Sequence, residues 1–285
     1  MERTAYGKIN LGLQVLGKRP DGYHEVDMIL QSISLADTIT FTPAPDFGLE
    51  TDRPDLPCDD SNLMVKAAKA FARATGCAVN YQLACRKRIF LAAGLAGGST
   101  DAAAVLRGLN DLCGRPLDRT GLERLGATIG SDVPFCVYGG TQRGRGRGEQ
   151  MTVLPEAPLL WLVLVKPREL GVSTAWVYGE IDKATDRESV DLDGLEEALR
   201  QGDRKRLLAL MKNDLEQVTL KAHPELQDLK KAIAAQGAEK VLMSGSGPTL
   251  FGIFASRDEA EKAARRLREI ERDAQIEIAH TVQEE

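Results

Sequence analysis

Residues 94–104, with the sequence GLAGGSTDAAA, constrain the chain more than any other segment. The preceding residues 79–91 alternate in part like a strand, and apolar residues at helical spacing follow the run. A glycine-rich turn that opens a helix brings backbone N–H groups together at the positive end of the helix dipole. Ser99 and Thr100 add hydroxyl groups for a phosphate or for magnesium. The segment predicts a phosphate-binding loop; the alternative is a tight turn with a Ser or Thr cap.

Several common motifs are absent from the sequence. No Gly-Lys-Ser/Thr follows the loop, and its glycines do not have the G-x-G-x-x-G spacing of a dinucleotide-binding turn. No G-x-S-x-G, H-E-x-x-H or catalytically spaced Cys/His pair occurs. The phosphate-binding hypothesis therefore depends on the helix N-terminus, the glycines and the two hydroxyl groups, not on one of these motifs.

Composition narrows the class of protein. The 285 residues are 43% hydrophobic and 28% charged, with a net charge of −5, which argues against a nucleic-acid partner. We find no apolar run of membrane-spanning length and no signal-peptide core, so we expect no membrane association. Five cysteines without a C-x-x-C spacing favour a reduced, cytoplasmic protein.

The order of expected elements predicts an α+β class, because strands and helices mix without strict alternation. We expect two strands within 26–43, joined at Ala36-Asp37, and a helix over 61–76. Residues 143–150 are expected to form a solvated basic loop, and the alternative is that its three arginines meet a phosphate. A domain boundary is placed nearby, giving domains 1–155 and 156–285. In the second domain we expect strands at 159–166, 240–243, 249–254 and 275–282 and a helix at 257–272.

Four further segments are candidates for chemistry. Asp132 lies in a fixed Gly-Ser-Asp-Val-Pro turn, where an Asp more commonly caps a helix. Lys8 and Asn10 share one face of a strand, which can instead be a solvated face. A Pro-Asp-Gly turn precedes Tyr23 and His24, and the alternative for His24 is an ordinary hydrogen-bonded loop residue. Residues 243–249 form a second Gly/Ser loop or a plain hairpin turn.

These segments together resemble the GHMP kinase superfamily of small-molecule kinases. The superfamily's ATP loop is similar to residues 90–104, its G-[AS]-D-V-P segment to 130–134, and its C-terminal Gly/Ser motif to 243–254. The run from Lys8 to His24, which ends in Asp-Gly-Tyr-His, is typical of the branch that acts on a cytidyl-diphosphate-linked methylerythritol. Phe90 and Ala96 depart from the usual Pro and Gly of the ATP loop.

The resemblance implies a two-lobe GHMP kinase fold, with an N-terminal lobe like domain 2 of ribosomal protein S5 and a ferredoxin-like C-terminal lobe. It implies ATP-dependent phosphorylation of the 2-hydroxyl of that substrate, in the non-mevalonate route to isoprenoid precursors. Magnesium would accompany ATP, and the sequence assigns no metal ligand. The partners would be these small molecules, and the protein would be a monomer or a weak homodimer.

The resemblance also implies roles for individual residues. Asp132 would accept or orient the proton of the substrate hydroxyl, and Lys8 would keep Asp132 ionised and neutralise the transferring group. Substrate-binding residues would be Asn10, Tyr23, His24, Thr174 and Tyr178, with the aromatic rings stacking on cytosine and His24 reading its edge. The alternative for Tyr178 is a core residue on one face of a helix. The ATP-binding residues would be Phe90, Leu91, Ala92, Ala93, Gly94, Leu95, Ala96, Gly97, Gly98, Ser99, Thr100, Asn62 and Leu63.

Two alternatives remain at this point. One is another GHMP kinase, such as a homoserine, mevalonate or galactose-type kinase, in which the Tyr23-His24 segment would be absent. The other is a non-catalytic S5-like module that binds RNA or a regulatory ligand. The negative net charge and the presence of both Lys8 and Asp132 argue against the second alternative.

Overall fold

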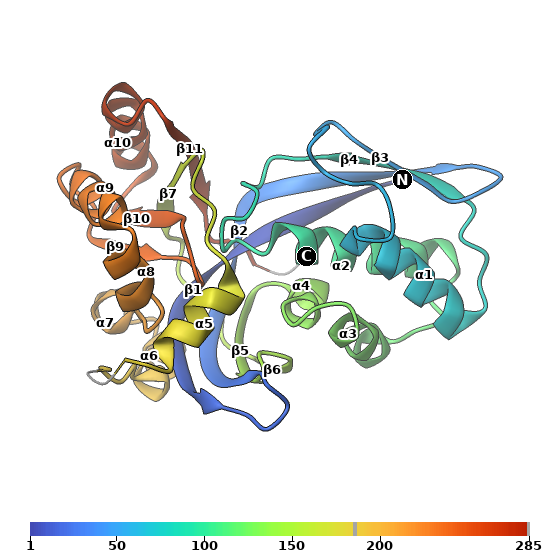
Figure 1. Ribbon diagram of the computed structural model, residues 1–285, viewed down its shortest axis with the longest axis horizontal. Coiled ribbons are helices and arrows are strands. Elements are labelled where there is room, and N and C mark those ends of the chain that lie inside the picture. Colours follow the sequence, from blue (N-terminus) through green and yellow to red (C-terminus); the bar gives the residue numbers. More distant parts are fainter. Residues whose placement is uncertain (185–186, 284–285) are drawn as a thin grey trace. The chain divides into compact units, whose positions relative to one another are not determined.

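Two long strands open the chain, β1 (Glu2–Lys18) and β2 (His24–Pro43), and both run through each of two compact units. The computed structural model describes residues 1–184 and 187–283 (Figure 1). Unit 1 comprises Met1–Gly7, Ala36–Ile89 and Ala96–Gly139, and unit 2 comprises Lys8–Leu35, Phe90–Leu95 and Gly140–Glu285. These units are clusters of the folded chain, and they do not test the expected domains 1–155 and 156–285.

Unit 1 packs helices on a small sheet. The second half of β2 pairs antiparallel with β4 (Tyr81–Arg86), and β3 (Gly48–Thr51) pairs parallel with β4. The helices are α1 (Leu63–Thr75), α2 (Gly97–Leu112), α3 (Arg119–Ala127) and α4 (Val133–Tyr138). They lie together on one side of these strands, with α2 in contact with each of the others (Figure 1).

The boundaries of α1 have local causes. The Asn62 side chain accepts a hydrogen bond from the Met64 N–H at 2.9 Å, and Gly76 ends the helix with a φ of 72°. The helix was expected to begin after a Ser61 cap, so the observed cap lies one residue later. Residues Thr100–Leu106 of helix α2 are all buried. The small alanine side chains in this stretch let the helix approach the strands closely.

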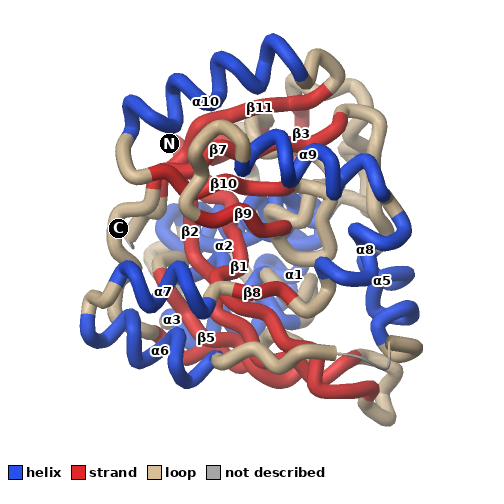
Figure 2. The backbone as a smooth tube through the Cα atoms, turned by 90° about the vertical axis from the view of Figure 1, so that its left-hand side faces the viewer, coloured by secondary structure: helices blue, strands red, loops and turns tan. Residues whose placement is uncertain are grey.

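Unit 2 contains the remaining sheet pairs and a second sheet. The first half of β2 pairs with β5 (Thr141–Gly146), which pairs with β6 (Gln150–Val153), and β1 pairs with β8 (Lys212–Asn213). The second sheet has the antiparallel order β11 (Ala274–His280), β7 (Trp161–Pro167), β10 (Leu250–Phe254), β9 (Lys240–Met243), visible from top to bottom in Figure 2.

The helices of unit 2 flank these strands. Helices α9 (Pro224–Ala234) and α10 (Arg257–Ile270) pack on β10 and β7 and cover one face of the second sheet (Figure 1). The others are α5 (Thr174–Ile181), α6 (Leu192–Gln201), α7 (Arg204–Leu210) and α8 (Glu216–Ala222). The α+β class is confirmed, and the strands and helix expected between 240 and 282 are found within two residues of their expected ends.

Two local expectations were wrong. Residues 26–43 form one continuous strand rather than two, because Asp37 is buried and accepts hydrogen bonds from the backbone N–H groups of Arg88 and Ile89 instead of making a turn. Residues 143–150 form the β5–β6 hairpin rather than a solvated loop. The buried Arg143 guanidinium bonds to Asp27, Asp193 and Glu196 at 2.7 Å each, and these bonds raise its pKa.

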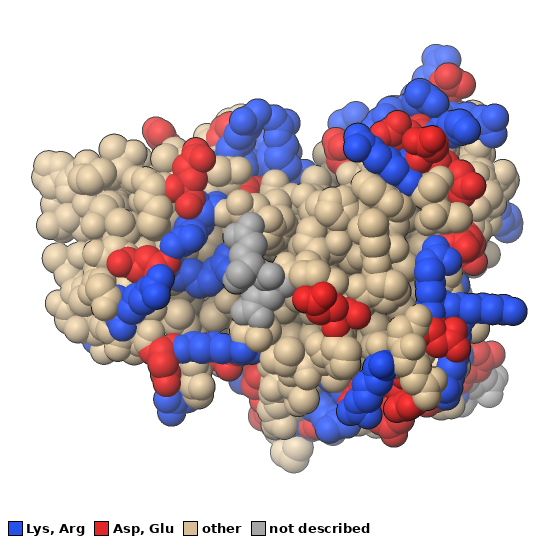
Figure 3. Space-filling view, turned by 180° about the vertical axis from the view of Figure 1, so that it is seen from behind, with Lys and Arg blue, Asp and Glu red and all other residues tan. Residues whose placement is uncertain are grey.

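Charged side chains of both signs are interspersed on the face drawn in Figure 3. Within the described part of the chain, we find no helix that is both long and apolar enough to cross a membrane.

The packing of α2 on β2 predicts a stability change. A Cβ at Gly108 would lie 2.3 Å from Cζ of Phe41, so Gly108→Ala forces the ring or the helix to move. We expect the free energy of unfolding to fall by about 1–3 kcal/mol, measured by urea denaturation. Gly179→Ala is the matched control: its Cβ meets no atom within 4 Å, and alanine should stabilise helix α5 by up to about 1 kcal/mol. Equal stability of both variants would contradict the close packing.

Candidate active site

The N-terminus of α2 in unit 1 is open to a ligand. Ala96 precedes the helix with a φ of 58°, and no side chain caps it. The first backbone bond runs from the Thr100 N–H to the Ala96 carbonyl at 2.9 Å, so the N–H groups of Gly97, Gly98 and Ser99 have no acceptor within the helix. Three such groups at the positive end of a helix dipole make an anion site. The expected cap by Ser99 or Thr100 is not formed.

The two hydroxyl groups of this turn differ in their surroundings. Thr100 is buried, and its hydroxyl donates to the Tyr6 carbonyl at 2.7 Å. Ser99 is half-buried, and its hydroxyl makes no hydrogen bond within residues 1–184 and 187–283. Gly130 lies beside it, since a Cβ on Gly130 would be 3.9 Å from Ser99 Oγ. The turn that contains Asp132 therefore approaches the start of α2.

Asp132 begins α4 without capping it. It occupies the N-cap position with helical φ and ψ, and its side chain makes no capping bond. The half-buried carboxylate has no hydrogen bond or ion pair in the described part of the chain. The capping alternative for Asp132 is therefore wrong, and the carboxylate is available to a ligand.

Asn62 and Leu63 mark the start of α1. Both polar atoms of the Asn62 side chain are engaged: Oδ1 in the cap, and Nδ2 donating to the Pro57 carbonyl at 2.7 Å. Leu63 faces the start of α2, because its Cδ1 lies 3.5 Å from where a Cβ on Gly98 would be. Leu63 thus supplies an apolar surface beside the expected ATP loop.

A buried charge cluster beneath the start of α2 was missed by the sequence analysis. Lys87 Nζ forms ion pairs with Asp37 and, at 2.5 Å, with Asp101, and all three side chains are almost fully buried. A Cβ on Gly97 would lie 3.6 Å from the same Nζ. Two features of the sequence could have indicated the cluster: Asp37 lies within the apolar run 26–43, and Asp101 lies within the alanine-rich start of α2. We call these three residues the Lys87 cluster.

Two carboxylates share one ammonium group in the Lys87 cluster. Burial raises the pKa of Asp101 to about 7, Lys87 opposes the rise, and repulsion from Asp37 adds to it. Asp101 Oδ1 is buried without a hydrogen-bond partner in the described part of the chain. A proton on Asp101 would relieve the excess negative charge, since like charges disfavour double ionisation.

The raised pKa predicts a pH dependence of stability. Between the ordinary carboxyl pKa of 3.8 and about 7, folded Asp101 holds a proton that the unfolded chain has lost. The contribution of Asp101 to the free energy of unfolding therefore falls as pH rises through this window. Asp101→Asn removes this contribution, so the native protein should lose its advantage over the variant as pH increases. Urea denaturation below and above the window measures the difference, and parallel pH profiles would contradict the prediction.

In unit 2, Lys8 and Asn10 form a buried pair on β1. Lys8 Nζ donates to Asn10 Oδ1 at 2.8 Å, and Asn10 Nδ2 contacts the Met28 sulfur at 3.6 Å. A Cβ on Gly245 would lie 3.2 Å from Lys8 Nζ. The pair is therefore buried beside the second Gly/Ser loop rather than on a solvated face.

The second Gly/Ser loop is more than a hairpin turn between β9 and β10. A Cβ on Gly94 would lie 2.1 Å from the Ser244 carbonyl oxygen, and the Ser244 hydroxyl donates to the Gly94 carbonyl at 2.9 Å. Asn213 Nδ2 donates to the carbonyls of Met243 and Gly245 at 2.8 and 2.7 Å. The beginning of the expected ATP loop thus packs directly on this loop. Of its residues there, Phe90, Ala93 and Leu95 are buried, and Leu91, Ala92 and Gly94 are more exposed.

This contact predicts different tolerances at two glycines of the expected ATP loop. Gly94 has a φ of 74° and no room for a Cβ, so Gly94→Ala should displace the loop and weaken ATP binding by about tenfold or more. Gly98 lies in α2, and a Cβ there would meet only Leu63 at 3.5 Å. Gly98→Ala is therefore the matched control, with affinity within a few-fold of the native protein. Calorimetric titration with ATP measures both, and normal affinity of a folded Gly94→Ala would contradict the role of the contact.

The remaining expected substrate residues also lie in unit 2. Tyr23 is 52% exposed, and the Arg147 guanidinium lies 4.8 Å from its ring centroid. The rings of His24 and Tyr178 are 5.0 Å apart. The hydroxyl groups of Thr174 and Ser246 are 2.9 Å apart, which joins the start of α5 to the second Gly/Ser loop.

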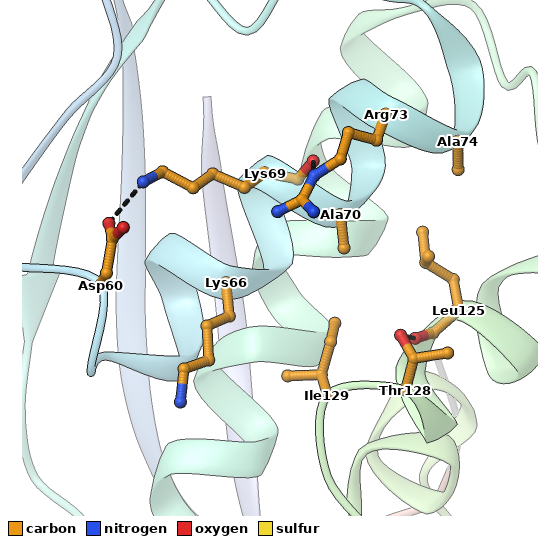
Figure 4. Close-up of a pocket in the computed structure, with 9 residues that line it drawn as sticks. All are labelled: Asp60, Lys66, Lys69, Ala70, Arg73, Ala74, Leu125, Thr128 and Ile129. Atoms are coloured by element: carbon orange, nitrogen blue, oxygen red, sulfur yellow. Dashed lines mark hydrogen bonds and ion pairs between the residues drawn. The ribbon is translucent and has the colours of Figure 1, made fainter.

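A separate cavity of about 620 Å³ lies between α1 and α3 in unit 1 (Figure 4). Lys66, Lys69 and Arg73 extend from α1 along it, and Lys69 pairs with Asp60. It contains none of the expected ATP-loop residues and no acidic residue other than Asp60. The catalytic candidates are therefore not part of this cavity.

Comparison with known proteins defines the family. Residues 62–140 match the GHMP kinases N terminal domain, and residues 195–272 match the GHMP kinases C terminal domain. The chain belongs to the GHMP kinase family and is an ATP-dependent small-molecule kinase, as the resemblance implied.

Relatives that match over nearly the whole of both chains share a more specific name. The chain is 48% identical to a 4-diphosphocytidyl-2-C-methyl-D-erythritol kinase of Moorella thermoacetica, over 93% of this chain and 94% of the relative. It is 43% identical to the kinase of that name from Pelotomaculum thermopropionicum, over 97% and 96% of the two chains. A crystal structure of 4-(cytidine 5'-diphospho)-2C-methyl-D-erythritol kinase has a TM-score of 0.82 at 34% identity and covers 99% of both chains. A mevalonate kinase of L. major, at 20% identity and a TM-score of 0.75, shares the fold.

Proposed function

We propose that the protein transfers the γ-phosphoryl group of ATP to the 2-hydroxyl of 4-diphosphocytidyl-2-C-methyl-D-erythritol, in the non-mevalonate route to isoprenoid precursors. The observation that carries the proposal is chain-long similarity, at 48% identity, to a kinase named for this substrate. The available Asp132 carboxylate and the uncapped start of α2 support it, because phosphoryl transfer needs an oriented acceptor and a site for phosphate.

ATP would be held by the expected loop and by the start of α1. The free N–H groups of Gly97, Gly98 and Ser99 would bind phosphate oxygens, and Leu63 would cover the nucleotide. Magnesium prefers oxygen ligands and keeps several waters beside phosphates. The half-buried Ser99 hydroxyl fits this preference, and magnesium would neutralise phosphate charge when bound.

The acceptor hydroxyl would be activated by Asp132. A tertiary hydroxyl is hindered and weakly acidic, so its orientation toward the phosphorus contributes strongly to the rate. A carboxylate without protein partners can accept this hydrogen bond and take the proton as the new P–O bond forms. Lys8, whose ammonium group is held by Asn10, would neutralise charge on the transferring group.

The cytidine moiety would bind in unit 2. Tyr23 has an exposed ring for stacking, while His24 and Tyr178 contact each other. Asn10 and Thr174 are placed beside the second Gly/Ser loop and would bind substrate hydroxyl or phosphate groups.

We propose further that the domains divide between residues 155 and 156 and that the protein is cytoplasmic. We propose that it is a monomer or a weak homodimer.

A coupled assay of ADP release tests the proposed substrate. ATP is supplied with the cytidyl-diphosphate substrate, with homoserine or with mevalonate. Turnover with the first alone supports the proposal. Faster turnover with homoserine or mevalonate would assign the protein to another branch of the family.

Asp132→Asn tests the proposed acceptor residue. The amide keeps the shape of the side chain but cannot take a proton, so we expect kcat to fall by about 10²–10⁴ with little change in the affinity for either substrate. Asp118→Asn is a control at the start of α3, where the side chain caps a helix. A kcat of Asp132→Asn within threefold of the native value would contradict the assignment.

A further inference from the structure

One imidazole in unit 2 is held by two residues of the same helix. The His24 ring is 5.0 Å from the Tyr178 ring, and His24 Nε2 lies 2.8 Å from Oδ1 of Asp182. Tyr178 is on α5, and Asp182 is its C-cap, four residues later. Residues four apart lie on the same face of a helix. Helix α5 therefore fixes both the plane of the imidazole and its rotation within that plane.

The hydrogen bond to Asp182 determines which ring nitrogen carries the proton. An ionised carboxylate only accepts hydrogen bonds, so Nε2 must be the donor. In a neutral imidazole the other nitrogen, Nδ1, is then unprotonated and acts as an acceptor. The His24 side chain is only 8% exposed, and no second hydrogen bond to its ring is found within the described residues. Nδ1 is therefore left as an acceptor for a ligand.

Cytosine and uracil differ at the group that such an acceptor distinguishes. Cytosine has a 4-amino group, which donates a hydrogen bond, whereas uracil has a 4-oxo group, which only accepts. An unprotonated Nδ1 can bond to the first and faces an unpaired oxygen in the second. The reverse tautomer, with a proton on Nδ1, would favour uracil.

We infer that Asp182 is a positioning residue that sets the preference for cytosine over uracil by holding His24 in its Nε2–H tautomer. The inference rests on the proposed function, because it takes the base of the acceptor substrate to lie at His24. Asp182 acts through His24 and need not touch the substrate. If Asp182 had a purely structural role, it would hold the start of β2 against α5 without affecting the choice of base.

Two substitutions at Asp182 separate these roles. Asp182→Ala removes the acceptor for Nε2–H, so we expect the ratio of the Kd for UDP to the Kd for CDP to fall about tenfold, the loss expected for one hydrogen bond. Asp182→Asn keeps a carbonyl oxygen that can accept from Nε2–H, so the native ratio should be largely retained. Lys183→Ala is the control at the same helix end, since Lys183 pairs with Glu180 and not with His24.

Calorimetric titrations with CDP, UDP and ATP give the decisive outcomes. A reduced ratio in Asp182→Ala only, with ATP affinity unchanged, supports the inference. An unchanged ratio in folded Asp182→Ala, or an equal loss of CDP and UDP, overturns it. If the native protein does not bind CDP at all, the proposed function fails instead, which distinguishes the two failures.

A second measurement does not depend on the folding of a variant. Two-bond ¹H–¹⁵N correlation spectra of the native protein report the tautomer of each histidine, and the chain has three, at positions 24, 223 and 280. The His24→Gln spectrum assigns the signal. An Nε2–H pattern for His24 in the CDP complex is expected, and an Nδ1–H or doubly protonated pattern would overturn the inference.

Discussion

Unit 1 depends on the two buried ion pairs that the Lys87 ammonium group makes. This ammonium group joins Asp37 in the middle of β2 to Asp101 in the first turns of α2, and the other oxygen of Asp37 holds the backbone at Arg88 and Ile89. The strand, the segment that leaves β4 and the start of the helix thus meet at one buried charge. Breaking one partner of a buried ion pair leaves an uncompensated charge, which is strongly destabilising. The position of the free N–H groups of α2 follows from this arrangement.

Unit 2 positions its polar groups through loops held by side chains. Asn213 and Thr219 bind carbonyl groups of the second Gly/Ser loop, and that loop in turn packs on Gly94 and Lys8. The β5–β6 hairpin of the same unit is held by Arg143, and its Arg147 lies over Tyr23.

Many boundaries of helices and strands could be predicted from the sequence. The start of α2, the end of α1 at Gly76 and the strands and helix after residue 240 follow from glycine positions and apolar periodicity, which are local properties. The Lys87 cluster does not, because its partners are 50 and 14 residues away and a single charged residue in an apolar run looks like a turn. Arg143 was assigned to a loop because alternating glycines weaken the expectation of a strand, while its partner Asp27 lies 116 residues away. Local sequence patterns therefore carry the least information about ion pairs between residues far apart in the chain.

The position of the new phosphate on the product shows whether the protein phosphorylates a tertiary hydroxyl. Proton-coupled ³¹P NMR of the product made from ATP and the cytidyl-diphosphate substrate determines this position directly. The carbon that bears the 2-hydroxyl has no hydrogen, so phosphorus attached there has no three-bond coupling to a proton. We expect a new phosphomonoester signal that is a singlet in the proton-coupled spectrum. A triplet from a primary position, a doublet from a secondary position, or no new signal in the presence of ATP and magnesium would contradict it.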